Sequence, residues 1–408
     1  MFTRKKLLEK FDKECLKSDA LLIHLRWPKW SGKTNFIQSA IKEGYINDSM
    51  SRYLSLDDSI IGEIDTPKGF NIYISQIREL TSGRFYCIFD NAEYIPWLFD
   101  IIENYIESTG DKDTRFIIIN PNKIPETIFQ QTVVTFTVNP FSFKEFVEIQ
   151  WKTIELMALK NNPSIINNFT PLVDEYVRMG GYPDVVFAGN EEREQILQKI
   201  FQDIKYSLLS NIKTRDHAIF LSFLQVLANQ TGELLKIDRL SQITDIPRRT
   251  IERFLEILEN EWVIFIVFPF VKNKEKETSV HKKFYFSDLG YLRTLLGPYA
   301  FQGADRQHIY ENFVFLELYR NLVPAHTIYF YRKKSQAEIT FILENNTTQQ
   351  LTPIDVIERS TEAIPQAFTS FDSDYWNSVN RYVVFNINKL TDKELGTKKV
   401  YILPHIAV

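Results

Sequence analysis

Gly32, Lys33 and Thr34 are residues whose types and order suit the binding of a phosphate chain. The apolar run 20–25 precedes them and a helical pattern over 33–44 follows, which is the strand, loop and helix order that such a site needs. A glycine lets the backbone approach a phosphate closely, and the N-terminus of a helix directs N–H groups at it. We therefore predict that ATP or ADP binds here. The predicted contacts come from Ser31, Gly32, Lys33, Thr34 and Asn35, with Thr34 as a ligand of Mg²⁺.

Trp27 stands where the phosphate-loop pattern has its first glycine. An indole at this position must either shift the loop or point outward. Trp27 and Trp30 could stack on an adenine or contact a partner protein. The alternative is that they fill a pocket that no nucleotide uses.

Asp90 ends the apolar run 85–89 and is the second predicted Mg²⁺ contact, acting through water. An active ATPase normally has a glutamate next, which polarises the attacking water. Asn91 follows here, and an amide cannot accept a proton. Glu93 could take that catalytic role only if the backbone bent before it. The alternative is that Asp90 merely caps the next helix.

Apolar runs that read as strands alternate with helical patterns over the first part of the chain. Such alternation indicates a parallel sheet covered by helices, and near-continuous apolar strands fit burial on both faces. The expected strands are 20–25, 52–56, 85–89, 115–119 and 133–138, and the expected helices are 33–44, 70–81 and 96–108.

A helix-turn-helix pattern occupies 216–270, with helices expected at 218–228, 236–246 and 247–260. Apolar runs over 262–270 and 282–288 would form the strands of a wing. Basic residues near the start of the third helix, with lysines of the wing, make DNA a candidate partner. Neighbouring glutamates dilute this charge, and such modules also bind proteins. The candidate DNA contacts are Arg248, Arg249, Arg253 and Lys282, followed by Lys283 and preceded by Lys272, Lys274 and Lys276.

Composition bounds the class of protein. A chain of 408 residues predicts two to four modules, and 44% hydrophobic with 25% charged residues is typical of globular proteins. The net charge of -4 gives no overall attraction to nucleic acid or anionic membranes. Two distant cysteines, six histidines without metal-binding spacing and the lack of a long apolar run predict a cytoplasmic protein that contacts no membrane.

Seven motifs in one order resemble those of the bacterial and archaeal AAA-type ATPases that carry a winged helix and a C-terminal nuclease-like module of unknown function. The resemblance covers nearly the whole chain. It implies an α/β fold: an AAA-type parallel-sheet P-loop domain with a helical lid, a winged helix, and a C-terminal restriction-endonuclease-like α/β domain. The motifs are WPKWSGKT (27–34), FDNAE (89–93), PFSFKEF (140–146), YVRMGGYPD (176–184), KFYFSDLGYL (283–292), YENFVFLEL (310–318) and YFYRKKSQAEITFIL (329–343).

The departures from the motifs of this family are concentrated among the residues expected to bind and hydrolyse the nucleotide. Trp27 replaces the first loop glycine, and Asn91 replaces the glutamate after Asp90. Asn120 or Asn122 stands in for the polar sensor of the fourth strand. Gln130 and Gln131 align with a Gly-Arg pair whose arginine could reach a neighbour's phosphate. Together these changes argue against rapid hydrolysis.

The nuclease-like module departs from its family in the same way. Glu311 matches the helix carboxylate, but Thr340 replaces the aspartate of the second strand. Asp355 and Ile357 align with Glu-x-Lys, and isoleucine cannot replace the lysine. We expect no cleavage, with Glu338 and Asp355 left as a weak cation site.

The resemblance places the P-loop core at 1–145, the helical lid at 146–210, the winged helix at 211–275 and the nuclease-like domain, inactive, at 276–408. The leading hypothesis is a degenerate AAA-type ATP-binding protein with slow or absent hydrolysis, which acts as a binding or scaffold module. One alternative is an active ATPase that acts on DNA or protein, with Asp90 and Glu93 as catalytic residues. The other is an interaction protein whose nucleotide pocket is closed by Trp27.

Overall fold

The computed structural model describes residues 4–26, 28–56, 64–120, 133–150, 159, 164–271, 281–297, 306–323, 325–333 and 337–408. The chain forms two compact units, which are described separately. The first comprises Met1–Asn139 with Asn260–Trp262, and the second comprises Pro140–Glu259 with Val263–Val408.

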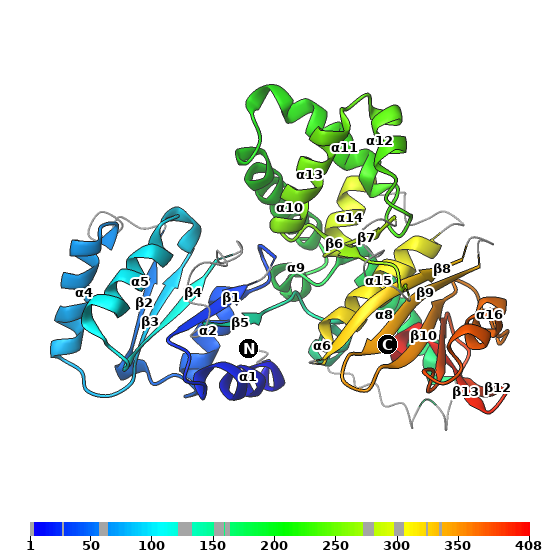
Figure 1. The fold of residues 1–408 in the computed structure, drawn as a ribbon, viewed down its shortest axis with the longest axis horizontal. Helices are drawn as coiled ribbons and strands as arrows, with labels where there is room; N and C mark the ends of the chain where they lie inside the picture. Colours follow the sequence, from blue (N-terminus) through cyan, green and yellow to red (C-terminus); the bar gives the residue numbers. More distant parts are fainter. Residues whose placement is uncertain are drawn as a thin grey trace. The chain divides into compact units, whose positions relative to one another are not determined.

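The first unit contains a five-stranded parallel sheet in the order β2-β3-β4-β1-β5 (Figure 1). Every strand expected in this part of the sequence is present, so the predicted parallel sheet is confirmed. The strands are β1 (Leu22–Arg26), β2 (Ser51–Ser55), β3 (Phe85–Asp90), β4 (Thr114–Ile119) and β5 (Val133–Thr137).

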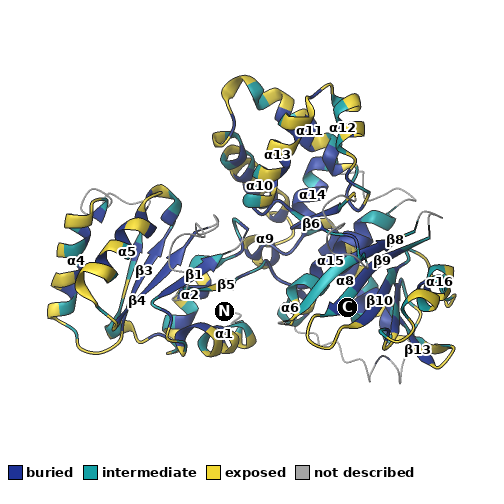
Figure 2. Cartoon of the chain, in the orientation of Figure 1, coloured by how far each residue is buried: buried dark blue, intermediate teal, exposed yellow. Residues whose placement is uncertain are grey.

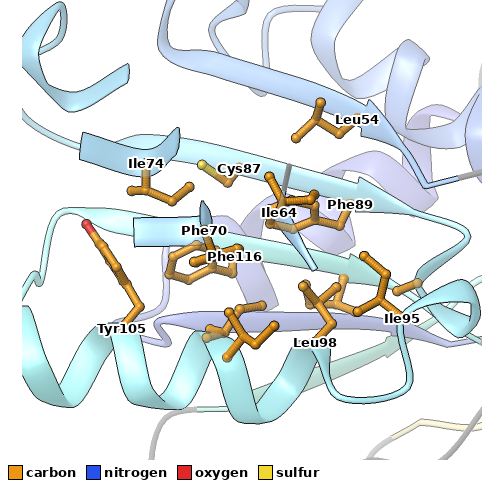
Figure 3. Close-up of a cluster of buried hydrophobic side chains, with 14 of the residues drawn as sticks. Leu54, Ile64, Phe70, Ile74, Cys87, Phe89, Ile95, Leu98, Tyr105 and Phe116 are labelled. Carbon is orange, nitrogen blue, oxygen red and sulfur yellow. The ribbon is translucent and has the colours of Figure 1, made fainter. Parts of the chain in front are cut away.

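Helices cover both faces of this sheet because its central strands are apolar on both sides. All residues of β3 and β4 are buried (Figure 2). One face packs against α4 (Pro67–Glu79) and α5 (Leu98–Thr109), with Phe70, Phe89 and Phe116 in mutual contact (Figure 3). The other face packs against α1 (Lys5–Phe11), the helical turn Asp12–Leu16 and α2 (Lys33–Lys42).

The second unit begins with helices and ends with a mixed sheet. Helices and a hairpin lie where the helix-turn-helix and wing patterns predict them. In chain order the elements are α6 (Phe143–Ile149), α8 (Ile165–Met179), α9 (Pro183–Phe187), α10 (Arg193–Ser210), α11 (His217–Ala228), α12 (Ile237–Thr244), α13 (Arg248–Asn260), the antiparallel pair β6 (Ile264–Val267) and β7 (Lys283–Phe286), α14 (Leu289–Leu296) and α15 (Gln307–Arg320).

The C-terminal sheet has six strands in the order β12-β13-β11-β10-β9-β8. Strands β8, β9 and β10 pair antiparallel, β10, β11 and β13 pair parallel, and β12 returns antiparallel to β13. The elements are β8 (His326–Arg332), β9 (Glu338–Asn345), β10 (Gln350–Val356), α16 (Gln366–Tyr375), β11 (Tyr382–Asn386), β12 (Thr391–Leu395) and β13 (Lys398–Pro404).

Several motifs that carry the family resemblance contact one another inside the second unit. The buried carboxylate of Asp288 accepts hydrogen bonds of 2.8 Å from the backbone N–H groups of Gly181 and Gly290. The side chain of Asn312 bonds both the N–H and the carbonyl of Phe286, each at 2.8 Å. The bonds of Asp288 to Gly181 and of Asn312 to Phe286 join residues far apart in sequence, which fixes the relative positions of α8, β7 and α15.

The segment 140–145 belongs with the second unit, whereas the predicted boundary near 145 groups it with the P-loop core. Phe141 N–H donates to the carbonyl of Gly181 at 2.8 Å, and its own carbonyl accepts from the Tyr176 hydroxyl at 2.6 Å. Phe143 N–H donates to the buried Glu317 carboxylate at 2.9 Å. These contacts hold the segment on the helices that follow it in sequence.

Candidate nucleotide site

The ends of three neighbouring strands bring the predicted site residues to one edge of the parallel sheet. Strand β4 lies between β1 and β3, with Leu25 beside Ile119 and Phe89 beside Ile118. In parallel sheets, ligands bind at the carboxyl ends of the strands. The loop after β1, Asp90 at the end of β3 and Asn120 after β4 therefore share this edge.

The loop between β1 and α2 turns sharply before the helix begins. Trp30 and Gly32 both adopt left-handed backbone conformations, with φ of 67° and 83°. Gly32 is the N-cap of α2 and has no side chain with which to cap the helix. Ser31 between them is buried, and its hydroxyl has no hydrogen-bond partner in the described part of the chain. Trp27 lies outside the described residues.

Lys33, Thr34 and Asn35 form the first turn of α2, as predicted. The side chains of Lys33 and Thr34 are half-buried, whereas that of Asn35 is exposed. The N-terminal turn of a helix with a lysine in it is a suitable environment for an anion.

Asp90 is buried, and both of its carboxylate oxygens accept hydrogen bonds. Oδ2 accepts from the Thr34 hydroxyl at 2.6 Å and from the Tyr53 hydroxyl at 2.5 Å, while Oδ1 accepts from Asn91 N–H at 2.8 Å. Since the Thr34 oxygen gives its proton to Asp90, its lone pairs stay available for a cation. The pair therefore fits Mg²⁺. The prediction from sequence omits Tyr53, because a tyrosine within a strand is ordinary there.

Asn91 occupies the position of the water-activating glutamate, and both its backbone and its side chain are held in place. Its backbone is left-handed, with φ of 57°, a conformation that asparagine tolerates better than most residues. Its side-chain amide donates to the Ser55 hydroxyl at the end of β2, at 3.1 Å. The backbone therefore bends here, and the short helix Ala92–Tyr94 follows directly. Glu93 in that helix is half-buried, and its Oε2 has no hydrogen-bond partner within the described residues.

Asn120, the candidate sensor residue, is buried beside His24 of β1. The Nε2 atom of His24 lies 3.2 Å from the Asn120 carbonyl, which can only accept, so Nε2 carries the proton. Burial lowers the pKa of His24 to about 4, which keeps the ring neutral at pH 7. His24 is therefore a packed, neutral residue of β1. Asn122, Gln130 and Gln131 lie outside the described residues.

Comparisons with known proteins agree with this geometry for the first unit. Residues 22–147 match the family described as "AAA domain". The five-stranded parallel sheet of this segment fits an AAA-type P-loop domain. Residues 170–300 and 306–405 match two families described as domains of unknown function, DUF8612 and DUF4143.

Two curated relatives, both uncharacterized proteins, match larger parts of the chain. One, from Haemophilus influenzae, is 24% identical over 277 residues, which are 66% of this chain and 66% of the relative. The other, from Methanocaldococcus jannaschii, is 24% identical over 338 residues, covering 76% of this chain and 69% of the relative. Among solved structures, the Aeropyrum pernix Orc1 protein in complex with DNA is similar at 9% identity and a TM-score of 0.33, covering 72% of this chain and 91% of that one.

The basic residues predicted to meet DNA are exposed on α13, but two of them already have acidic partners. Arg248 pairs with Asp238 at 2.8 Å and with Glu252 at 3.1 Å, and Arg253 pairs with Asp216 at 3.1 Å. Arg249 forms no ion pair within the described residues. The half-buried Lys282 lies with its Nζ 4.5 Å from the centre of the Phe268 ring. The wing lysines 272, 274 and 276 lie outside the described residues.

Lys283 lies in β7 but is buried, contrary to its predicted place on a DNA-contacting surface. Its side chain is 3% exposed, and its ammonium pairs with Glu338 and lies 3.9 Å from Glu311. Both carboxylates come from the C-terminal part of the chain, so their approach to β7 could not be seen in the sequence around Lys283. A buried lysine needs such partners to remain charged.

The predicted nuclease-like residues line one cavity of about 600 Å³, which Glu311, Glu338, Thr340 and Asp355 share. The Thr340 hydroxyl donates to Asp355 Oδ1 at 2.7 Å. Burial raises the pKa of Asp355 to about 6. Burial alone would also raise the pKa of Glu311, but the nearby His308 ring and the charge of Lys283 outweigh it and lower that pKa. Glu338 is neutralised by Lys283 and by Arg332 at 2.8 Å.

No cluster of histidine, cysteine, aspartate and glutamate able to hold a metal ion occurs among the described residues. Of the carboxylates in this cavity, Glu311 and Glu338 are paired with Lys283, whereas Asp355 accepts a hydrogen bond from Thr340. Within the same described ranges, no helix has the length and apolar character needed to cross a membrane.

Proposed function

We propose that this protein binds ATP or ADP with Mg²⁺ at the edge of the parallel sheet and hydrolyses it slowly or not at all. Lys33, Thr34 and the amides around Gly32 would hold the phosphates, and Thr34 with Asp90 would hold the metal. The bound Mg²⁺ would neutralise phosphate charge. The nucleotide would then serve a binding or scaffold role.

One observation carries this proposal: a single buried carboxylate, Asp90, joins the first turn of α2 to the end of β3 through Thr34. If Asp90 only capped the helix that follows it, no hydrogen bond from the Thr34 hydroxyl would be needed. The arrangement leaves the Thr34 oxygen able to ligate a cation while Asp90 holds it in place. The buried Ser31 hydroxyl, unpartnered in the described residues, adds a donor in the same loop.

Slow turnover is supported by the contacts of Asn91. An amide cannot act as a general base, and this one already donates to Ser55. No other carboxylate within the described residues hydrogen-bonds to Asn91 or Asp90. The groups that bind phosphate are thus better preserved than the group that activates water.

Titration with a fluorescent ATP analogue in Mg²⁺ tests the binding proposal. We expect Lys33→Ala to weaken binding at least tenfold, because the lysine charge acts directly on the phosphates. The matched control is Lys42→Ala, which removes the same charge from an exposed position at the other end of α2. Equal affinity of the wild type and both variants, or no binding by the wild type, would reject it.

A second candidate function is active hydrolysis with Glu93 as the base. The left-handed turn at Asn91 and the unpartnered Glu93 Oε2 favour it, since they supply the bend and the acceptor it needs. Phosphate release from the wild type, Glu93→Gln and Asp90→Ala distinguishes the two candidates. Rapid release that both substitutions abolish would replace the binding role with catalysis.

For the second unit we propose a winged helix formed by α11, α12, α13, β6 and β7, followed by a nuclease-like module that does not cleave. The order of three helices and an antiparallel pair supports the first assignment, and the pairing of Glu338 with Lys283 and Arg332 supports the second. DNA or a protein is the proposed partner. Because Arg248 and Arg253 are exposed, their ion pairs are weak and a phosphate could displace them.

A further inference from the structure

A small polar cavity of about 180 Å³ lies within the second unit, apart from the proposed nuclease-like cavity but sharing Glu338 with it. One wall comes from the turn after α11 and the start of α12. The other comes from β7, the first turn of α15 and the facing ends of β8 and β9. The lining residues are Gln230, Gly232, Glu233, Leu234, Lys236, Arg239, Lys283, His308, Arg332 and Glu338.

The two walls are joined by backbone contacts, so the cavity is a built feature of the fold. Gly232 N–H donates to the Phe284 carbonyl at 3.0 Å, and Leu235 N–H donates to the Lys282 carbonyl at 2.7 Å. Gly232 has a φ of +77°, and a Cβ on it would lie 3.0 Å from His308 Nδ1. A glycine is therefore required where the turn passes over the start of α15.

The cavity carries an excess of positive charge. Lys283 and Arg332 share the carboxylate of Glu338. Lys236 and Arg239 are exposed, and neither forms an ion pair in the part of the chain that the structure describes. The four cations outnumber Glu233 and Glu338, and they still do when Glu311 behind the wall is included. The Glu311 carboxylate, 3.5 Å from Nδ1 of His308, raises the pKa of that ring, which adds positive charge as the pH falls.

The orientation of α15 adds to the positive potential of the cavity. The helix begins at Gln307 and runs for 14 residues, so its N-terminal turn, which holds His308, presents partial positive charge to the cavity. The cavity is smaller than the roughly 300–1,000 Å³ of sites that enclose a whole drug-sized ligand. It suits one phosphate group better than a complete nucleotide.

We propose that this cavity binds a backbone phosphate of a nucleic acid, with Lys236 and Arg239 as its direct contacts and Lys283 behind them. The two exposed cations lie on the open wall, where a strand can continue in both directions, whereas an enclosed site would be needed for a free nucleotide. The surface differs from the α13 surface, whose Arg248 and Arg253 are held by carboxylates. The proposal does not depend on nucleotide binding, which belongs to the first unit.

Fluorescence anisotropy with the full chain tests this, using a labelled 20-nucleotide single strand and its duplex, without nucleotide, at several salt concentrations. The variant is Lys236→Ala/Arg239→Ala. The matched control is Arg381→Ala/Lys399→Ala, which removes one arginine and one lysine from exposed positions elsewhere in the second unit. We expect the cavity variant to bind about tenfold more weakly, while the control stays within about twofold.

The salt dependence supplies a second readout that a general loss of charge does not reproduce. For each phosphate that the variant no longer binds, the slope of log affinity against log salt should fall by about 0.9 with duplex and about 0.7 with single strand. Equal decreases in affinity for both double variants would overturn the proposal, as would a wild type that binds neither strand.

A final arm separates a polynucleotide from free phosphate. Pyrophosphate is titrated into proteins that also carry Lys33→Ala, so that binding at the nucleotide site of the first unit does not contribute to the signal. Displacement of the labelled strand by pyrophosphate in the control but not in the cavity variant supports the shared site. Pyrophosphate binding that depends on Lys236 and Arg239, with strand binding that does not, would overturn the nucleic-acid assignment.

Discussion

The Thr34 hydroxyl donates a 2.6 Å hydrogen bond to Asp90 Oδ2, although the two residues are 56 positions apart. This bond connects the first turn of α2 to the end of β3, and the Tyr53 hydroxyl joins the same oxygen from β2. The carboxylate thus holds three segments together at the edge of the sheet where phosphate would bind. Its structural role and its proposed metal role can be separated by substitution.

Asp90→Asn should remove the Mg²⁺ dependence of nucleotide binding. The amide keeps the size of the side chain but carries no charge to hold the water shell of the metal. We expect the affinity for an ATP analogue in Mg²⁺ to fall at least tenfold, about 1.4 kcal/mol, and to become insensitive to EDTA. Asp100→Asn, at an exposed position of α5, is the control. A variant that still responded to Mg²⁺ like the wild type would show that Asp90 is no metal contact.

Tyr53→Phe should destabilise the first unit. The substitution removes a hydrogen bond to a buried carboxylate, and such bonds to charged groups contribute about 1.5–3 kcal/mol. Hydrogen exchange in peptides from β2 and β3 measures the local free energy of opening. Tyr45→Phe is the control, because Tyr45 is half-buried in the same unit and its hydroxyl makes no hydrogen bond to the described residues. Matching decreases in stability for the two variants would mean that the Tyr53 hydroxyl contributes nothing specific.

The sequence predicts the sheet of the first unit well because its strands are continuous apolar runs with loop residues between them. Asp90 and Thr34 are also predicted, since a phosphate loop and a carboxylate at a strand end are local patterns. Tyr53 and Ser55 are missed because their partners lie on another strand. Their roles follow from the strand register, which places Ser55 beside Asp90.

Lys283 shows the opposite error, a residue assigned to the surface and found in the interior. A run of basic residues around 282 resembles a solvated wing, and only the fold brings Glu311 and Glu338 to this lysine. The same limit applies to Arg248 and Arg253: the sequence places them on the outer face of a helix, but not beside Asp238 and Asp216. Ion pairs between residues far apart in sequence cannot be predicted from periodicity and local motifs.

Three histidines should have pKa values shifted from the usual value of the side chain, two of them downward and one upward. Burial lowers the pKa of His24 to about 4 and that of His405 to about 3, whereas the Glu311 carboxylate beside His308 raises the pKa of that ring. NMR of labelled histidine side chains measures all three, with His24→Gln and His405→Gln variants to assign the signals. A His24 signal that titrated near 6.5 would contradict its buried position.

The sign of the stability effect follows from these shifts. His24 has a lower pKa in the folded state than in the unfolded state, so the unfolded chain binds more protons between pH 6.5 and about 4. Stability of the first unit is therefore complete above pH 6.5 and falls by up to about 3 kcal/mol as the pH drops through this window. His24→Gln should flatten that dependence.

Asp355→Asn should change the pH dependence of the second unit in the other direction. The pKa of Asp355 is raised to about 6 from 3.8, so the folded state binds more protons in that window and loses stability as the pH rises through it. The asparagine oxygen can still accept from Thr340. The free energy of unfolding of the wild type should fall by up to about 3 kcal/mol between pH 4 and pH 7.5. That of the variant should not show this decrease. Hydrogen exchange in β10 and β11, corrected for intrinsic rates, measures this, and an unchanged pH dependence would show that Asp355 ionises freely.

Gly181→Ala should destabilise the second unit and leave nucleotide binding by the first unit unchanged. A Cβ at Gly181 would lie 2.2 Å from the Phe141 carbonyl oxygen, so the backbone must move and the Phe141 contacts with it. We expect a loss of about 1–3 kcal/mol, as for overpacking elsewhere. Gly189→Ala is the control, since nothing lies within 4 Å of its Cβ position and a change below about 0.5 kcal/mol is expected. Hydrogen exchange in α8 and α15 follows the second unit, while the fluorescent ATP analogue follows the first. If Gly181→Ala weakened nucleotide binding as much as it loosened α8, the two units would be energetically coupled, and the segment around Phe141 would be the first place to look for the connection.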